Sequence, residues 1–162
     1  MMVLSYIMRQ NKMYHHLIRS VLTFLFVSSS MFFFSQEIPV KWHISQNKEK
    51  TKLIFNASID STWHLYAVNL PNPNEGPLPT EFHFNEDEGF KIIGGIVENE
   101  PISVFDASFG VQVSYFEKKA IFKQKIKVIE NKTLMKIKIA YMVCNQHTCI
   151  PFDDFFELTL EI

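Results

Sequence analysis

Two cysteines, Cys144 and Cys149, are the strongest candidates for chemistry in the 162-residue chain, which contains no others. Residues 145–148 separate them, and Pro151 follows the second. In an oxidising compartment a lone cysteine pair usually forms a disulfide, whereas in the cytosol it more often binds a metal or takes part in catalysis. With Met142 and His147 the pair would also make a soft ligand set suited to Cu(I) or Zn(II). The choice between these interpretations depends on the compartment and on the strands that carry the pair.

The first 35 residues have the pattern of a secretory signal peptide. Three basic residues precede an apolar stretch at residues 21–34, and the first acidic residue is Glu37. That stretch is shorter than the roughly 20 residues of a spanning helix, so a permanent anchor is the weaker alternative. We expect a signal peptide at residues 1–35 and an exported domain at residues 36–162.

Composition and charge exclude several classes of protein. The chain is 47% hydrophobic and 20% charged, which is ordinary for a globular protein and too apolar for disorder. Its formal charge of −1 offers no basic footprint, so we expect no nucleic-acid partner. Without the leader, 13 basic and 17 acidic side chains leave a formal charge of −4.

Short alternating runs, and no helical pattern, fill the chain after residue 36. Apolar and polar residues alternate over residues 38–44 and 53–59. Further strand-like runs cover residues 63–66, 80–84, 90–97, 111–116, 120–129, 133–144 and 155–162. Residues 70–79 are too rich in proline for a central strand. Eight or nine short strands predict an all-β, immunoglobulin-like β-sandwich, with a closed barrel as the alternative.

The cysteines stand at the ends of two of these strands. Alternation places Tyr141 and Val143 on one face and Cys144 on the opposite, outward face, which Cys149 shares. A four-residue hairpin loop sets Cys144 opposite Cys149, and the same register sets Lys136 opposite Glu157. Directly opposed residues have Cα atoms about 4.5–5.5 Å apart, within the range that a disulfide tolerates. We therefore expect a bridged pair near the surface.

Spacing favours a reactive disulfide over a structural one. Closing a loop of about six residues is worth only about 2 kcal/mol, against nearly 5 for a long loop. Strained or exposed disulfides are the labile, catalytic ones. A structural disulfide and a metal site remain as alternatives, while the other histidines show no ligand spacing.

Four segments carry a family resemblance. Upstream of the Cys-x4-Cys-x-Pro hairpin lie Trp63-His64-Leu65-Tyr66, Gly76-Pro77-Leu78-Pro79-Thr80-Glu81-Phe82 and Tyr115-Phe116-Glu117-Lys118-Lys119-Ala120. Together they resemble the N-terminal periplasmic domain of the thiol:disulfide interchange protein DsbD, in the form common in Bacteroidetes-type bacteria. The resemblance covers residues 37–162.

The resemblance implies a thiol-disulfide oxidoreductase of the protein-disulfide reductase type, with no cofactor. Such a domain receives electrons from a thioredoxin-like domain, which obtains them from a membrane electron-transfer protein. It then reduces periplasmic disulfide proteins, including isomerases and cytochrome c maturation proteins.

The resemblance also implies roles for individual residues. Cys144 and Cys149 match the redox pair, Tyr115 and Phe116 match an aromatic cap over it, and His64 and Tyr66 match aromatic positions beside it. The chain departs from the family at three positions: Val113 and Ser114 replace acidic residues before the cap, and Phe152 replaces a second proline.

Family members continue into a membrane domain and a thioredoxin-like domain, whereas this sequence stops at Ile162. We expect either a stand-alone relay served by separate partners, or a fragment or decayed copy. The competing hypothesis is a secreted β-sandwich that binds proteins or glycans through loops such as residues 70–79. In that case the hairpin disulfide is purely structural.

Overall fold

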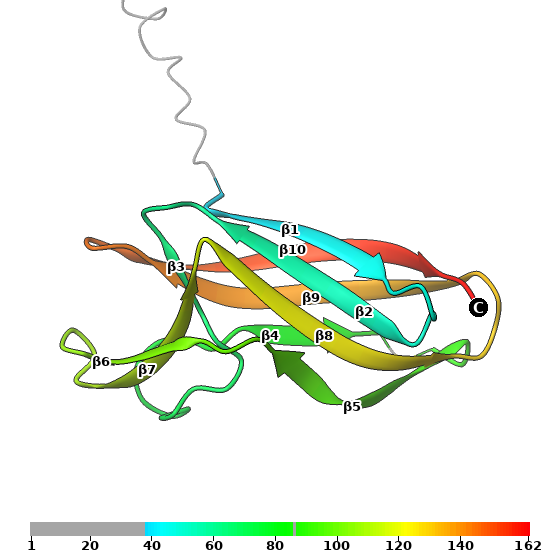
Figure 1. The fold of residues 1–162 in the computed structure, drawn as a ribbon, viewed down its shortest axis with the longest axis horizontal. Helices are drawn as coiled ribbons and strands as arrows, with labels where there is room; N and C mark the ends of the chain where they lie inside the picture. Colours follow the sequence, from blue (N-terminus) through cyan, green and yellow to red (C-terminus); the bar gives the residue numbers. More distant parts are fainter. Residues whose placement is uncertain (1–37, 86) are drawn as a thin grey trace, which may run out of the picture. The chain divides into compact units, whose positions relative to one another are not determined.

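The computed structural model describes residues 38–85 and 87–162, which form ten strands and no helix (Figure 1). The signal peptide expected at residues 1–35 lies outside the described residues. No helix long and apolar enough to cross a membrane occurs in the described part of the chain.

Two antiparallel sheets make up the fold. The first has the order β1-β2-β8-β5 and contains β1 (Val40–Gln46), β2 (Lys52–Ile59), β8 (Lys119–Val128) and β5 (Phe90–Glu98). The second has the order β10-β9-β3-β7-β6, with β4 also paired to β9. Its strands are β10 (Cys149–Leu160), β9 (Thr133–Cys144), β3 (His64–Tyr66), β7 (Val111–Glu117), β6 (Ile102–Asp106) and β4 (Glu81–Phe84). This is the expected immunoglobulin-like β-sandwich, and its open sheet edges exclude the closed barrel.

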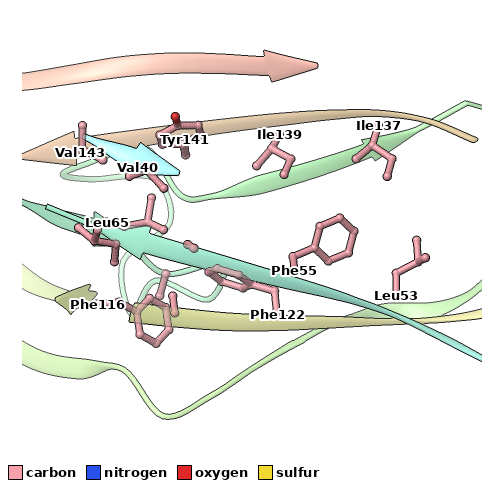
Figure 2. Close-up of a cluster of buried hydrophobic side chains, with 14 of the residues drawn as sticks. Val40, Leu53, Phe55, Leu65, Phe116, Phe122, Ile137, Ile139, Tyr141 and Val143 are labelled. Atoms are coloured by element: carbon pink, nitrogen blue, oxygen red, sulfur yellow. The ribbon is translucent and has the colours of Figure 1, made fainter. Parts of the chain in front are cut away.

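Side chains from both sheets meet in one core, as Figure 2 shows. Leu53, Phe55 and Ala57 alternate inward on β2, and Ile137 and Ile139 do so on β9. Inward alternation of apolar residues buries one face of each sheet. This burial fixes which face of β9 the remaining side chains, including Cys144, occupy.

Two strand expectations needed correction. Residues 102–106 form β6, which the sequence analysis missed, so the structure has ten strands instead of eight or nine. β10 begins at Cys149 and not at residue 155, because Pro151 and Phe152 continue the pairing with β9. An edge strand tolerates proline, since its outer side carries no ladder hydrogen bonds.

The connection from β7 to β8, which passes from one sheet to the other, is a single residue. Lys118, with φ of 61°, connects β7 in the second sheet to β8 in the first. Its carbonyl accepts a hydrogen bond from the Ile59 amide at 2.9 Å. The turn at residues 117–119 is therefore a sheet-to-sheet crossing, and it places Glu117 beside β3.

Candidate redox site

Cys144 and Cys149 are joined by a disulfide at the end of the β9–β10 hairpin. They are direct register partners with Cα atoms 4.1 Å apart, and Lys136 is likewise opposite Glu157, as predicted. The register runs without interruption from Cys149 to Leu160. The expected loop, register and disulfide are thus confirmed.

Asn145 organises the four-residue turn between the cysteines. Its side-chain oxygen accepts hydrogen bonds from the amides of His147 and Thr148, at 2.8 and 2.9 Å. Its own amide donates to the Thr148 carbonyl at 2.9 Å. Asn is favoured in such turns because its side chain accepts hydrogen bonds from backbone amides a few residues further on. The turn holds Cys149 at the start of β10.

The two cysteines differ in exposure. Cys149 is exposed, whereas Cys144 is only 2% exposed. The expectation that both lie near the surface is therefore wrong for Cys144. Its parity is as expected, opposite to Val143, but Tyr66 and Val113 pack against it in a second, smaller cluster. Only one sulfur of the disulfide is open to attack by a protein partner.

His64 lies at the centre of the row of residues that crosses the sheet at Cys144. β3 runs between β9 and β7, and His64 pairs in register with Cys144 on one side and with Glu117 on the other. Its Nε2 shares a hydrogen bond of 3.1 Å with the Tyr66 hydroxyl. The rings of His64 and Tyr115 have centroids 4.6 Å apart. The structure thus brings His64, Tyr66 and Tyr115 together beside the cysteines.

Burial determines the protonation of these groups. It lowers the pKa of His64, although the carboxylates of Asp106 and Glu117 act in the opposite direction. Burial also raises the pKa of the Tyr66 and Tyr115 hydroxyls, and the negative charge of Asp106 contributes to both. At neutral pH, His64 is therefore a neutral imidazole between two protonated phenols.

Phe116 is placed differently from the resemblance-based expectation. It is 3% exposed and packs in the main core, with its ring 5.6 Å from that of Phe122 (Figure 2). Successive residues of a strand point to opposite faces. Because Tyr115 faces the cysteine side, Phe116 must face the core and cannot cap the disulfide.

The β6–β7 hairpin supplies contacts that the sequence analysis did not assign. Phe109, in its turn, packs against Tyr66 with ring centroids 6.3 Å apart. Asp106 forms the turn by accepting hydrogen bonds from the amides of Ser108 and Gly110. Figure 1 places this hairpin at the same end of the sandwich as the β9–β10 turn. The turn from Asp106 to Gly110, which follows an apolar run, was the sequence signal that could have predicted this hairpin.

A groove of about 510 Å³ lies beside the cysteine turn. Its walls are part polar and part apolar, and they come from three segments: the turn before β3, the end of β7 and the cysteine loop. The lining residues are Ser61, Thr62, Trp63, His64, Glu117, Asn145, Gln146 and His147. The groove therefore adjoins the loop that leads to Cys149.

The sulfurs of the proposed metal set are already bonded to each other. His147 is exposed in the turn. Within residues 38–85 and 87–162, no group of three or more His, Cys, Asp or Glu side chains is arranged to hold a metal ion.

Two solved structures that contain the DsbD N-terminal domain of Neisseria meningitidis are similar to this chain. The DsbD N-terminal domain of Neisseria meningitidis, in the reduced form, is 12% identical with a TM-score of 0.58, and the match covers 80% of this chain and 91% of that one. The complex between the DsbD and PilB N-terminal domains of N. meningitidis gives 12% identity and a TM-score of 0.54, over 78% and 87% of the two chains.

A third structure, the N-terminal periplasmic domain of ScsB from Proteus mirabilis, is 16% identical with a TM-score of 0.50, over 75% of this chain and 45% of that one. At these identities the likenesses establish the fold alone. No curated protein matches the chain.

Membership of a family rests on the sequence itself. The family model described as "Thiol:disulfide interchange protein DsbD, N-terminal" matches residues 34–161, which is most of the chain. The match includes both cysteines and all of the described strands up to Leu160. The chain therefore belongs to the DsbD N-terminal family, as a thiol-disulfide interchange domain with one cysteine pair.

Proposed function

We propose that this domain relays electrons in the periplasm, from a thioredoxin-like donor to disulfide-bonded proteins, through Cys144 and Cys149. The observation that carries the proposal is the unequal burial of the pair: Cys149 is exposed and Cys144 is covered. A relay needs one sulfur that partners can reach and one that resolves the intermediate from inside.

The reduction of the domain proceeds in two exchanges. A thiolate of the donor attacks the Cys149 sulfur, the Cys144–Cys149 bond breaks, and Cys144 leaves as a thiolate that takes up a proton. The donor's second thiolate then attacks the donor's first sulfur, which is bonded to Cys149 in the mixed disulfide, and releases Cys149 as a thiolate. The donor is oxidised to a disulfide, and the domain gains two electrons and two protons.

Delivery of the electrons reverses these roles. The Cys149 thiolate attacks a substrate disulfide and releases one substrate thiol. Cys144 then loses its proton, attacks Cys149, and frees the second substrate thiol as the Cys144–Cys149 bond forms again. We assign the acceptance of the Cys144 proton to His64, because it is the register partner of Cys144 and burial keeps its imidazole neutral.

Partner recognition is assigned to the groove beside the cysteine turn. In N. meningitidis the DsbD N-terminal domain forms a complex with the PilB N-terminal domain, which supports a protein partner here. Tyr115 remains the proposed aromatic cover, joined by Phe109, whereas the core position of Phe116 removes it from that role.

Single-cysteine variants test the assignment. Cys144→Ala leaves Cys149, and Cys149→Ala leaves Cys144; each remaining thiol is activated as a thionitrobenzoate disulfide. A thioredoxin that lacks its second cysteine then displaces thionitrobenzoate and forms a stable covalent complex. We expect rapid complex formation at Cys149 and slow formation at Cys144, because access governs the exchange.

The competing hypothesis predicts a different result. If the domain is a binding module with a structural disulfide, neither variant forms the complex faster than an unfolded control peptide with one activated cysteine. Faster reaction at Cys144 would retain the relay but reverse the two cysteine roles.

A further inference from the structure

The outer face of the first sheet is basic. Seven lysines lie on its four strands, and all seven are exposed: Lys41, Lys52, Lys91, Lys119, Lys123, Lys125 and Lys127. We call this the lysine face. The same strands carry one acidic residue, Glu98, whose carboxylate accepts hydrogen bonds from Val68 and Asn69 in a connecting loop.

The lysine face is unusual because residues 36–162 are acidic overall. Residues 36–162 carry a formal charge of −4, yet the strands of the first sheet hold seven of its 13 basic residues. The second sheet has six acidic residues on its strands and two lysines. Those two, Lys136 and Lys138, lie 3.9 and 2.9 Å from carboxylates of β10. Among the described residues, no lysine of the lysine face forms an ion pair.

Like charges are placed directly opposite one another on this face. Lys125 pairs in register with Lys52, and Lys127 pairs with Lys91. Like charges at directly opposed positions destabilise a sheet. An anionic occupant would remove that repulsion, so the arrangement indicates a surface adapted to bind negative charge.

Residue type distinguishes the possible anionic partners. Residues 36–162 contain no arginine, so every cation of this face is a lysine. Protein interfaces are enriched in arginine and depleted in lysine, and bidentate recognition of phosphate or carboxylate favours arginine. Lysine is a hydrated point charge that suits diffuse attraction to a charged surface. An anionic lipid bilayer fits this chemistry better than an acidic protein does.

The dimensions and the apolar residues agree with a membrane surface. Lys119 and Lys127 stand about 26 Å apart along β8, taking about 3.3 Å per residue, so the face spans several lipid headgroups. Aliphatic side chains lie between the lysines, since Ile54 and Val97 are register partners of Lys123 on its two sides. Val97 is 61% exposed. Binding to a membrane surface strengthens with attraction between basic residues and anionic lipids and with the apolar area that the surface buries.

We propose that the lysine face holds the domain against an anionic phospholipid bilayer. The face lies on the first sheet, whereas Cys144 faces outward from the second. Adsorption through the lysines therefore leaves the cysteine pair open to other proteins while keeping the domain at the membrane surface.

Vesicle sedimentation tests the proposal on the full chain. The variant Lys125→Gln/Lys127→Gln removes two charges from the lysine face, and Lys136→Gln/Lys138→Gln removes two from the second sheet as a control. Binding is measured to vesicles of phosphatidylcholine with 30% phosphatidylglycerol and to phosphatidylcholine alone, at low and high salt. All proteins carry the same residues 1–37, so differences between them report the substituted face.

Each lysine near an anionic surface contributes about a fivefold increase in binding. We expect the Lys125/Lys127 variant to bind the anionic vesicles up to about 25-fold more weakly than the control. The difference should vanish on phosphatidylcholine and shrink at high salt. Equal binding of the two variants would overturn the proposal. So would a lysine-dependent self-association in sedimentation velocity, or lysine-dependent binding to dextran sulfate without binding to the vesicles.

Discussion

Reduction of the disulfide should weaken the fold only modestly. The bridge spans a sequence separation of 5, so it closes a loop of about six residues. Chain entropy for such a loop is worth about 2 kcal/mol at 25 °C. For a domain of this size, that loss lowers the melting temperature by about 8 °C, at roughly 4 °C per kcal/mol.

A cysteine-free variant separates loop closure from packing. Cys144→Ala/Cys149→Ser should lose about 2 kcal/mol from the missing bridge and about 1 more from the sulfur removed at the buried position. Alanine is chosen at residue 144 because a serine hydroxyl would be buried against Tyr66 and Val113. Phe55→Ala, in the core, should lose about 3–5 kcal/mol.

Urea titrations of the oxidised protein, the reduced protein and both variants measure these differences. The reduced wild type should fall between the oxidised protein and the cysteine-free variant, with an unchanged slope against urea. A loss of more than about 4 kcal/mol on reduction, or loss of the cooperative transition, would refute the short-loop reasoning. The disulfide would then be a structural element, and the argument for a redox role would fail.

Four further predictions concern reactivity and pH. The reduction potential of the pair should lie above about −300 mV in glutathione equilibration, since more negative values are typical of inert bridges. Tyr115→Ala should speed alkylation of the reduced cysteines with little loss of stability, whereas Phe116→Ala should lose about 3–5 kcal/mol of folding free energy. Equal alkylation rates in the wild type and in Tyr115→Ala would show that Tyr115 does not cover the pair. His64→Phe should lengthen the life of the mixed disulfide at pH 7 by up to about 30-fold, because an ordinary thiol is about 3% ionised there. Burial lowers the pKa of His64, so the folded protein binds fewer protons there than the unfolded chain does. The fold therefore loses stability as the pH falls below about 6.5. His64→Phe should reduce that loss in urea titrations at pH 7.5 and 5, and an unchanged pH dependence in the variant would contradict this prediction.

Local sequence determined the hairpin that carries the cysteines. Alternation along β9 and a four-residue loop were enough to predict that Cys144 lies opposite Cys149 and Lys136 opposite Glu157. Strand parity has a period of two, so register and face follow from neighbouring residues alone. The sandwich followed for the same reason, from a succession of such runs.

Exposure of the two sulfurs was decided by tertiary structure. Parity places Cys144 on the outer face of β9, but β3 and the β6–β7 hairpin bring Tyr66 and Val113 over it. β3 lies 66 residues or more before β9 in the sequence, so no local pattern indicates this contact. The same long-range pairing puts His64 beside Cys144. In the sequence, only the family resemblance linked these two residues.

The cap and the lysine face show the same division. Tyr115 and Phe116 are adjacent in sequence and were expected to act together, but strand geometry sends one to the cysteine cluster and the other to the core. The lysines of four strands are scattered from Lys41 to Lys127 in the sequence. They form one face only because β1, β2, β8 and β5 pair side by side, and long-range hydrogen bonding sets that order.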